Sequence, residues 1–342
     1  MIILLIILAL ISAWRLDISG YHGDYMAPKY TTAIKGIFTV LIFCSHIRGY
    51  QSLPDHWSNS LYSTVFDYLG QLIVVMFFFY SGFGIWESQK KKNDYTNTFF
   101  KRRILKTLLH FDIVIFLYIL VQAFSPIRYT TKDYLLCWIG WTSVGNSNWF
   151  IFVILGLYLI AHLSLLFQKK FGHGAILLTL VLSACFWIWL RIIMHQPSWW
   201  VDTLAAFPLG LIFSQYKPVL DQWLEKKNYY PVLAVLLSVV AFLLAYKFVK
   251  IDIYGGVSCL FCCLTMLLSS LVKIGNPILD WLGKNAFTIY IIQRLPMIVF
   301  SQLGINQPSA LYVVLVLTTT LLLAEGLSRL YTVTDKRLFA NA

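Results

Sequence analysis

The sequence predicts an all-α polytopic transmembrane helix bundle, and two observations carry this prediction. First, 59% of the 342 residues are hydrophobic and only 12% are charged, with a mean hydropathy of +0.71. Soluble domains carry about 25% charged residues. Second, apolar runs of about twenty residues, the length that crosses a bilayer as a helix, recur along the chain. No long hydrophilic stretch between them could fold as a separate soluble domain.

About eleven segments have the length and apolarity of a membrane span. The first is short, but it has no basic region before it and no clear small-residue cleavage site. We therefore expect residues 1–20 to hold a retained additional transmembrane helix rather than a signal sequence. The predicted spans are residues 1–14, 30–50, 61–86, 104–124, 149–168, 174–194, 199–215, 230–248, 253–272, 285–304 and 308–332.

Lysine and arginine are concentrated in alternate connections between these spans, most densely at 90–92 and 101–106. Basic connections stay in the cytoplasm. This pattern predicts a multi-pass protein with its C-terminus inside and its N-terminus outside. The net charge of +12 follows from these connections, so we expect a lipid bilayer and no nucleic acid as partner.

His46 lies inside the predicted span 30–50. An ionisable side chain in hydrocarbon is costly and usually lines a polar cavity or takes part in chemistry, and histidine exchanges protons near neutral pH. The span begins inside near Lys35, so a rise of about 1.5 Å per residue puts His46 about 16 Å further out, at or beyond the midplane. Taken alone, His46 is explained slightly better as a hydrogen-bonded interior histidine.

The densest basic cluster is Lys101–Lys106, at the inner start of the span 104–124. Arg103 and Lys106 are three residues apart and would share a helix face. Cations at a helix N-terminus oppose its dipole unless an anion lies there. The cluster therefore indicates either a phosphate site or positive-inside signalling alone.

Several segments together resemble the acyltransferase 3 family of membrane acyltransferases. The similar segments are Ile34-Lys-Gly-Ile37 followed by His46, Phe77-Phe-Phe-Tyr-Ser-Gly-Phe83, Phe99-Phe-Lys-Arg-Arg-Ile-Leu-Lys106, Asn148-Trp-Phe150, and residues 203–210 and 282–290. Each is weak alone, but their order and spacing are specific together. The resemblance implies a ten-helix acyltransferase transmembrane domain over residues 30–333, preceded by the additional N-terminal span.

The resemblance further implies an acyl-CoA-dependent O-acyltransferase of the plasma membrane. The acyl group, expected to be acetyl, would pass from cytoplasmic acyl-CoA to a hydroxyl of an extracytoplasmic or lipid-linked carbohydrate, as in O-acetylation of cell-envelope polysaccharide. Acyl-CoA would be a co-substrate, with no permanently bound cofactor and no metal. Oligomerisation or glycan-assembly partners are open expectations.

The resemblance implies roles for individual residues, and some of these residues depart from the family pattern. His46 matches the essential histidine of the family and would act as general base or as an acyl relay. Arg103 and Lys106 match the family's acyl-donor pair, but Lys106 replaces an arginine and lacks its bidentate fork. Lys35 stands where many members have arginine and is either a further acyl-CoA-binding candidate or the partner of a nearby acid. Gln293 takes the place of a common histidine, which puts a role for that position in doubt.

Three more polar residues are candidates from the sequence alone. Asp67 and Gln71, near the outer end of the span 61–86, could line an acceptor site. Glu325 lies within the last predicted span, where a carboxylate is a candidate for proton handling. We expect it to pair with Arg294 or Arg191, or to lie closer to the cytoplasm.

The main alternative function is a polytopic transporter or an exporter of a lipid-linked sugar. Such a protein would share the many spans and the intramembrane ionisable residues. Transporters often show internal repeats and paired broken helices, and neither is evident in the sequence.

Overall fold

A computed structural model describes residues 2–18, 20–51, 56–92, 94–125, 127–248, 254–307 and 309–339. It is about 80% helical and, within those residues, contains no strand. The helices are α1 (Ile2–Ala13), α2 (Pro28–Ile47), η1 (Arg48–Tyr50), α3 (Trp57–Leu69), α4 (Leu72–Lys91), α5 (Tyr95–Phe99), η2 (Phe100–Leu105), α6 (Lys106–Gln122), α7 (Thr131–Leu136), η3 (Cys137–Ile139), α8 (Trp149–Phe171), α9 (Ala175–Ile188), η4 (Trp189–Ile193), η5 (Ser198–Trp200), α10 (Ala206–Leu224), α11 (Tyr230–Phe248), α12 (Tyr254–Leu271), α13 (Pro277–Lys284), α14 (Ala286–Ile292), α15 (Arg294–Gln302) and α16 (Ser309–Leu338).

The predicted all-α polytopic bundle is confirmed. Eight helical segments in the described part of the chain are long and apolar enough to cross a membrane, and each overlaps a predicted span. The other three predicted spans fall on α1, on α10 and on the pair α14 and α15, which are shorter, more polar or interrupted. The number of eleven crossings therefore stays a prediction.

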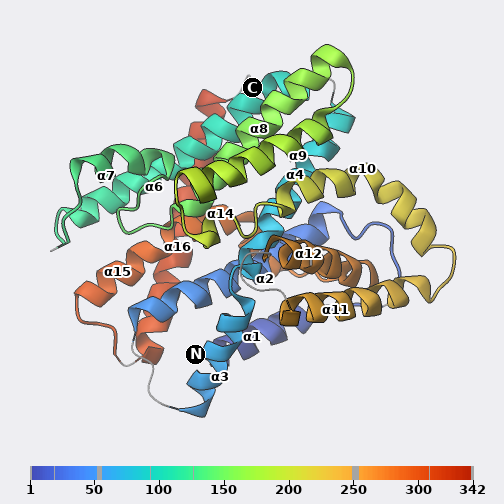
Figure 1. Cartoon of the computed structure of the whole chain (residues 1–342). Coiled ribbons are helices and arrows are strands. Elements are labelled where there is room, and N and C mark those ends of the chain that lie inside the picture. The colour runs from blue at the N-terminus through green and yellow to red at the C-terminus, as the bar shows by residue number, and fades with distance from the viewer. Residues whose placement is uncertain are drawn as a thin grey trace.

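Helix hairpins surround a central pair of helices (Figure 1). The helices α8 and α9 lie side by side, as do α11 and α12, while α2 and α4 run through the middle of the bundle. The helix α2 begins with Pro28, whose fixed φ suits the first turn and whose missing N–H is not needed there. Because α2 is unbroken to Ile47, it carries both Lys35 and His46.

Glycines allow two very close helix crossings at this centre. A Cβ at Gly283 of α13 would lie 1.9 Å from the backbone oxygen of Thr32 in α2, and one at Gly82 of α4 would lie 2.0 Å from that of Phe207 in α10. Real Cβ atoms do not approach so closely, so the backbones touch only because the side chains are absent. Small residues are the usual means of close packing between membrane helices.

Two predicted spans contain an interruption of the helix. The span 61–86 is split because Gly70 adopts φ +45° and ends α3, a conformation that glycine adopts without a Cβ penalty. The span 285–304 is interrupted at Gln293, between α14 and α15. Pro296 has no N–H for the carbonyl of Ile292, so the regular helix cannot continue through that turn.

Candidate active site

The candidate site is a cavity of about 320 Å³ enclosed by α2, α4, η2, α6, α8, α13 and α14. Its wall is mostly apolar and aromatic, formed by Ile42, Val74, Phe77, Tyr80, Phe150, Ile154, Tyr158, Phe287 and Tyr290. Three basic side chains, Lys35, Arg103 and Lys284, also line this wall, and Lys284 is paired with Asp280 at 2.6 Å. A cavity of this size and composition is typical of small-ligand sites.

Lys35 and Arg103 have no carboxylate within ion-pair distance among the described residues. Arg103 donates from Nε to the Tyr95 hydroxyl at 3.3 Å, which is a neutral partner. Both side chains are partly buried. Cations withdrawn from water without a counter-charge are costly, so this pair indicates the binding of an anion.

Arg103 lies where three cavities meet. It lines the central cavity, a second one of about 660 Å³ together with Lys35, and a third one of about 530 Å³ together with Arg102 and Lys106. The side chain is carried by η2, a π-helical turn directly before α6. Such turns occur frequently at functional sites because they change the direction in which side chains project.

Lys106 differs from Arg103 although both line the third cavity. Its Nζ lies 2.6 Å from Oδ2 of Asp335 on α16, and the other carboxylate oxygen of Asp335 lies 2.9 Å from His110 Nε2. Asp335, which is 229 residues away in the sequence, thus neutralises the charge of Lys106. The predicted pair shares one cavity, but only Arg103 reaches the central one.

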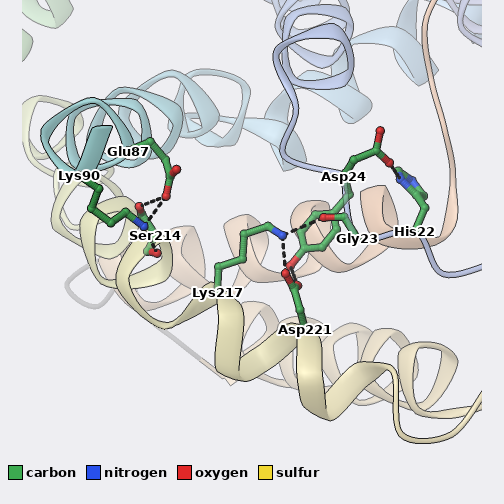
Figure 2. A network of polar contacts seen from close by, with 9 residues as sticks. His22, Gly23, Asp24, Glu87, Lys90, Ser214, Lys217 and Asp221 are labelled. Carbon is green, nitrogen blue, oxygen red and sulfur yellow. Dashed lines mark hydrogen bonds and ion pairs between the residues drawn. The ribbon is translucent and has the colours of Figure 1, made fainter. Parts of the chain in front are cut away.

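Two lysines, Lys217 of α10 and Lys90 of α4, are paired with carboxylates, as Figure 2 shows. Lys217 Nζ lies 2.5 Å from Asp221 and donates to the carbonyl of Gly23 at 2.9 Å. Lys90 lies 2.5 Å from Glu87, which also accepts from Ser214 at 2.7 Å. This network joins the segment before α2 to the helices α4 and α10.

His46 lies one turn beyond Ile42, which lines the central cavity. Its ring centroid is 6.0 Å from that of Tyr290, another lining residue. Its Nδ1 is 3.0 Å from Nε2 of Gln293. The histidine is therefore next to the cavity and further along α2 than Lys35, with a neutral amide as its hydrogen-bond partner.

Arg294, the residue after Gln293, is a further basic residue without a carboxylate partner among the described residues. Its Nε donates to the Tyr50 hydroxyl at 2.9 Å, and Nη1 lies 3.4 Å from the carbonyl of Asn146. The Asn146 Nδ2 is buried and has no partner in the described structure. A polar cluster of Arg294, Tyr50 and Asn146 thus adjoins Gln293, the residue that contacts His46.

The remaining candidates lie apart from His46. Asp67 is exposed and accepts from Arg48 at 2.7 Å, and Gln71 lies at the junction of α3 and α4. Glu325 pairs with Arg329 at 2.8 Å and accepts from Trp281 Nε1 at 3.2 Å. The expected pairing of Glu325 with Arg294 or Arg191 was wrong. Arg329 lies one turn further along the same helix and is the ion-pair partner instead.

Comparison with known families identifies the class of protein. The acyltransferase 3 family model, described as an acyltransferase domain, matches residues 29–328. The chain therefore belongs to this family, which makes it a membrane acyltransferase. No curated protein and no solved structure matched the chain.

Two site features were missed from the sequence. Gln293 was noted only for replacing a histidine, yet its side chain contacts His46. The proline three residues later was a local signal that the helix would be interrupted there. The tyrosine partner of Arg103 comes from α5, a short helix of five residues, and no periodic pattern in so short a segment would have predicted it.

Proposed function

We propose that this protein is an acyl-CoA-dependent O-acyltransferase that uses His46 to activate a hydroxyl of an extracytoplasmic or lipid-linked carbohydrate. The observation that carries the proposal is the cavity itself. Lys35 and Arg103, which lack carboxylate partners in the described chain, line it, and His46 adjoins it on the same helix as Lys35. Membership of the family supports acyl transfer in general.

The donor would enter from the cytoplasmic side. The phosphates of acyl-CoA are the anions that best fit Arg103, Lys35 and the third cavity, where Arg102 adds positive charge and Lys106 is paired with Asp335. The pantetheine arm would extend through the aromatic central cavity toward His46. About 16 Å of helix separates Lys35 from His46, so a long, thin donor is needed to join the two ends.

The reaction would then need one proton-transfer group. An alcohol is a poor nucleophile at neutral pH, so His46 takes its proton as the oxygen attacks the thioester carbonyl. The C–S bond breaks, and the proton passes from the imidazole to the leaving thiolate. An acyl-histidine intermediate is the covalent alternative.

The proposed orientation follows from the basic connections. The N-terminus would lie outside and the C-terminus inside the plasma membrane, with the cation-lined cavities on the cytoplasmic side. Acetyl is the proposed acyl group, because the central cavity of about 320 Å³ must also hold the pantetheine arm. The acceptor would be a polysaccharide or glycolipid of the cell envelope.

Purified protein with acetyl-CoA and a soluble glycan acceptor provides the test. His46→Ala should lower the rate of acyl transfer by about 10²-fold or more, while CoA still protects the variant against thermal unfolding. His162→Ala is the matched control, because His162 also lies in a span but stacks on Phe99. Full transfer by His46→Ala would contradict the mechanism.

A second experiment addresses the acceptor. Mass spectrometry of the surface glycans of a strain with and without the gene should reveal missing O-acyl groups. A transporter, the alternative function, would instead move an intact glycan independently of acyl-CoA, and its loss would remove the glycan rather than its acyl groups.

A further inference from the structure

Gln293 is the hydrogen-bond partner of His46 and is fully buried. Its Nε2 lies 3.0 Å from His46 Nδ1 and 3.4 Å from the carbonyl of Tyr290. Its Oε1 is buried and has no hydrogen-bond partner among the described residues. The amide nitrogen is therefore within hydrogen-bond distance of the histidine, while the amide oxygen has no partner in the described structure. A buried polar atom without a hydrogen bond is unusual.

Gln293 lies at the junction of α14 and α15, where Pro296 has no N–H to continue the helical hydrogen bonds. The backbone at Gln293 keeps helical φ and ψ angles. Two adjacent residues serve different contacts, with Gln293 on His46 and Arg294 on Tyr50.

The amide controls which nitrogen of His46 carries the proton. If Nε2 of Gln293 donates to Nδ1, the neutral ring holds its proton on its own Nε2 and has no lone pair there to act as a base. If Oε1 accepts from Nδ1–H, the lone pair is on Nε2. The two ends of an amide have nearly the same shape, so a rotation by half a turn exchanges these tautomers.

Only the second arrangement is compatible with base catalysis. When His46 takes a proton, both ring nitrogens become donors, and an amide N–H facing Nδ1 would then oppose a second N–H. Gln293 is the only side chain within hydrogen-bond distance of His46 Nδ1 in the described structure. Of the neighbouring groups, Arg294 on α15 donates to Tyr50, the Tyr290 ring centroid lies 6.0 Å from that of His46, and Arg48 in η1 is paired with Asp67.

We propose that Gln293 is a positioning residue for acyl transfer, in which Oε1 accepts the Nδ1–H of His46 so that the histidine Nε2 can take the acceptor's proton. The inference rests on the proposed function. The proton moves from the acceptor hydroxyl to Nε2, the new C–O bond forms at the thioester carbonyl, the C–S bond breaks, and the proton moves from Nε2 to the thiolate. The proton on Nδ1 stays on His46 throughout, hydrogen-bonded to Oε1 of Gln293.

A neutral amide suits this role better than a carboxylate would. A carboxylate at the same place would favour the charged imidazolium, and His46 would then need a higher pH to be available as a base. The amide fixes the tautomer without adding charge.

The test compares Gln293→Leu with the nearly isosteric Gln293→Glu. Gln293→Leu should lower kcat by at least about tenfold while the KM for acetyl-CoA stays within about twofold. Gln293→Glu should move the acidic limb of the pH profile of kcat/KM to higher pH by about one unit. Gln293→His, which offers a ring nitrogen as acceptor, should restore part of the kcat lost in Gln293→Leu.

Two outcomes would overturn the inference. One is a Gln293→Leu enzyme with unchanged kcat and pH profile. The other is a folded Gln293→Glu enzyme, checked by its Tm, whose acidic limb does not move. His46→Ala measured in the same assay keeps the two proposals apart, because full activity in that variant contradicts the proposed function itself, whereas its inactivity beside an unaffected Gln293→Leu contradicts only the role of Gln293.

Discussion

Basic residues near the same cavities form two groups, one with carboxylate partners and one without. Lys217 and Lys90 lie in a network with Asp221 and Glu87 that joins helices together (Figure 2). Lys35 and Arg103 line the central cavity with no carboxylate partner in the described residues. Within the described residues, carboxylates thus pair with the cations that serve structure, whereas Lys35 and Arg103, for which we propose that a substrate supplies the negative charge, have none.

Among the variants that test this comparison, Arg103→Ala should have the largest effect. Loss of the guanidinium at the meeting point of the three cavities should raise the KM for acetyl-CoA about 100-fold, as expected for charge-assisted bonds to phosphate. Steady-state kinetics against acetyl-CoA measures this. Lys101→Ala, which removes an exposed cation two residues away, is the control and should leave KM nearly unchanged, and equal effects of the two would contradict a specific site.

Lys217→Met should act on stability instead of binding. It leaves the mostly buried Asp221 without its cation, which should lower the free energy of unfolding by about 2 kcal/mol, seen as a lower Tm in detergent. The double variant Lys217→Met/Asp221→Asn should recover much of the loss. A raised KM for acetyl-CoA with an unchanged Tm would place Lys217 in the donor site and contradict the distinction between structural and substrate-binding cations.

Lys35→Met tests the second unpaired cation. We expect a KM for acetyl-CoA about tenfold higher, because a lysine offers a point charge without the fork of arginine. The Tm without CoA should stay the same or rise, since a partly buried cation with no ion-pair partner is removed. A large fall in Tm would show that Lys35 serves structure after all.

The smallest effect concerns Asp24, at the rim of the second cavity. Hydrogen bonds from Lys29 and then His22 lower the pKa of this carboxyl to about 2, from 3.8. Its contribution to stability is therefore present above pH 4 and is lost as the pH falls through 2. Because the group is exposed, Asp24→Asn should lower Tm by only about 1 °C at neutral pH, and this difference should vanish in thermal scans near pH 2.

Much of the fold and part of the site could be predicted from local patterns. Long apolar runs require helices because a bilayer offers no hydrogen bonds to an open backbone, and α2, which holds Lys35 and His46, follows the predicted span closely. The interruptions were harder. Gly70 and Pro296 are single residues whose effect depends on the turn they occupy, and both lay inside apolar runs.

The sequence by itself determined that this chain is a membrane helix bundle of an acyltransferase family, with a histidine within one helix and a basic segment at the start of another. These features depend on residue type and on spacing along one segment. Only the tertiary structure decided which cations lack partners and what His46 touches. Lys106 meets Asp335, and His46 meets Gln293, across more than 200 residues, and such contacts depend on how helices pack rather than on any local pattern.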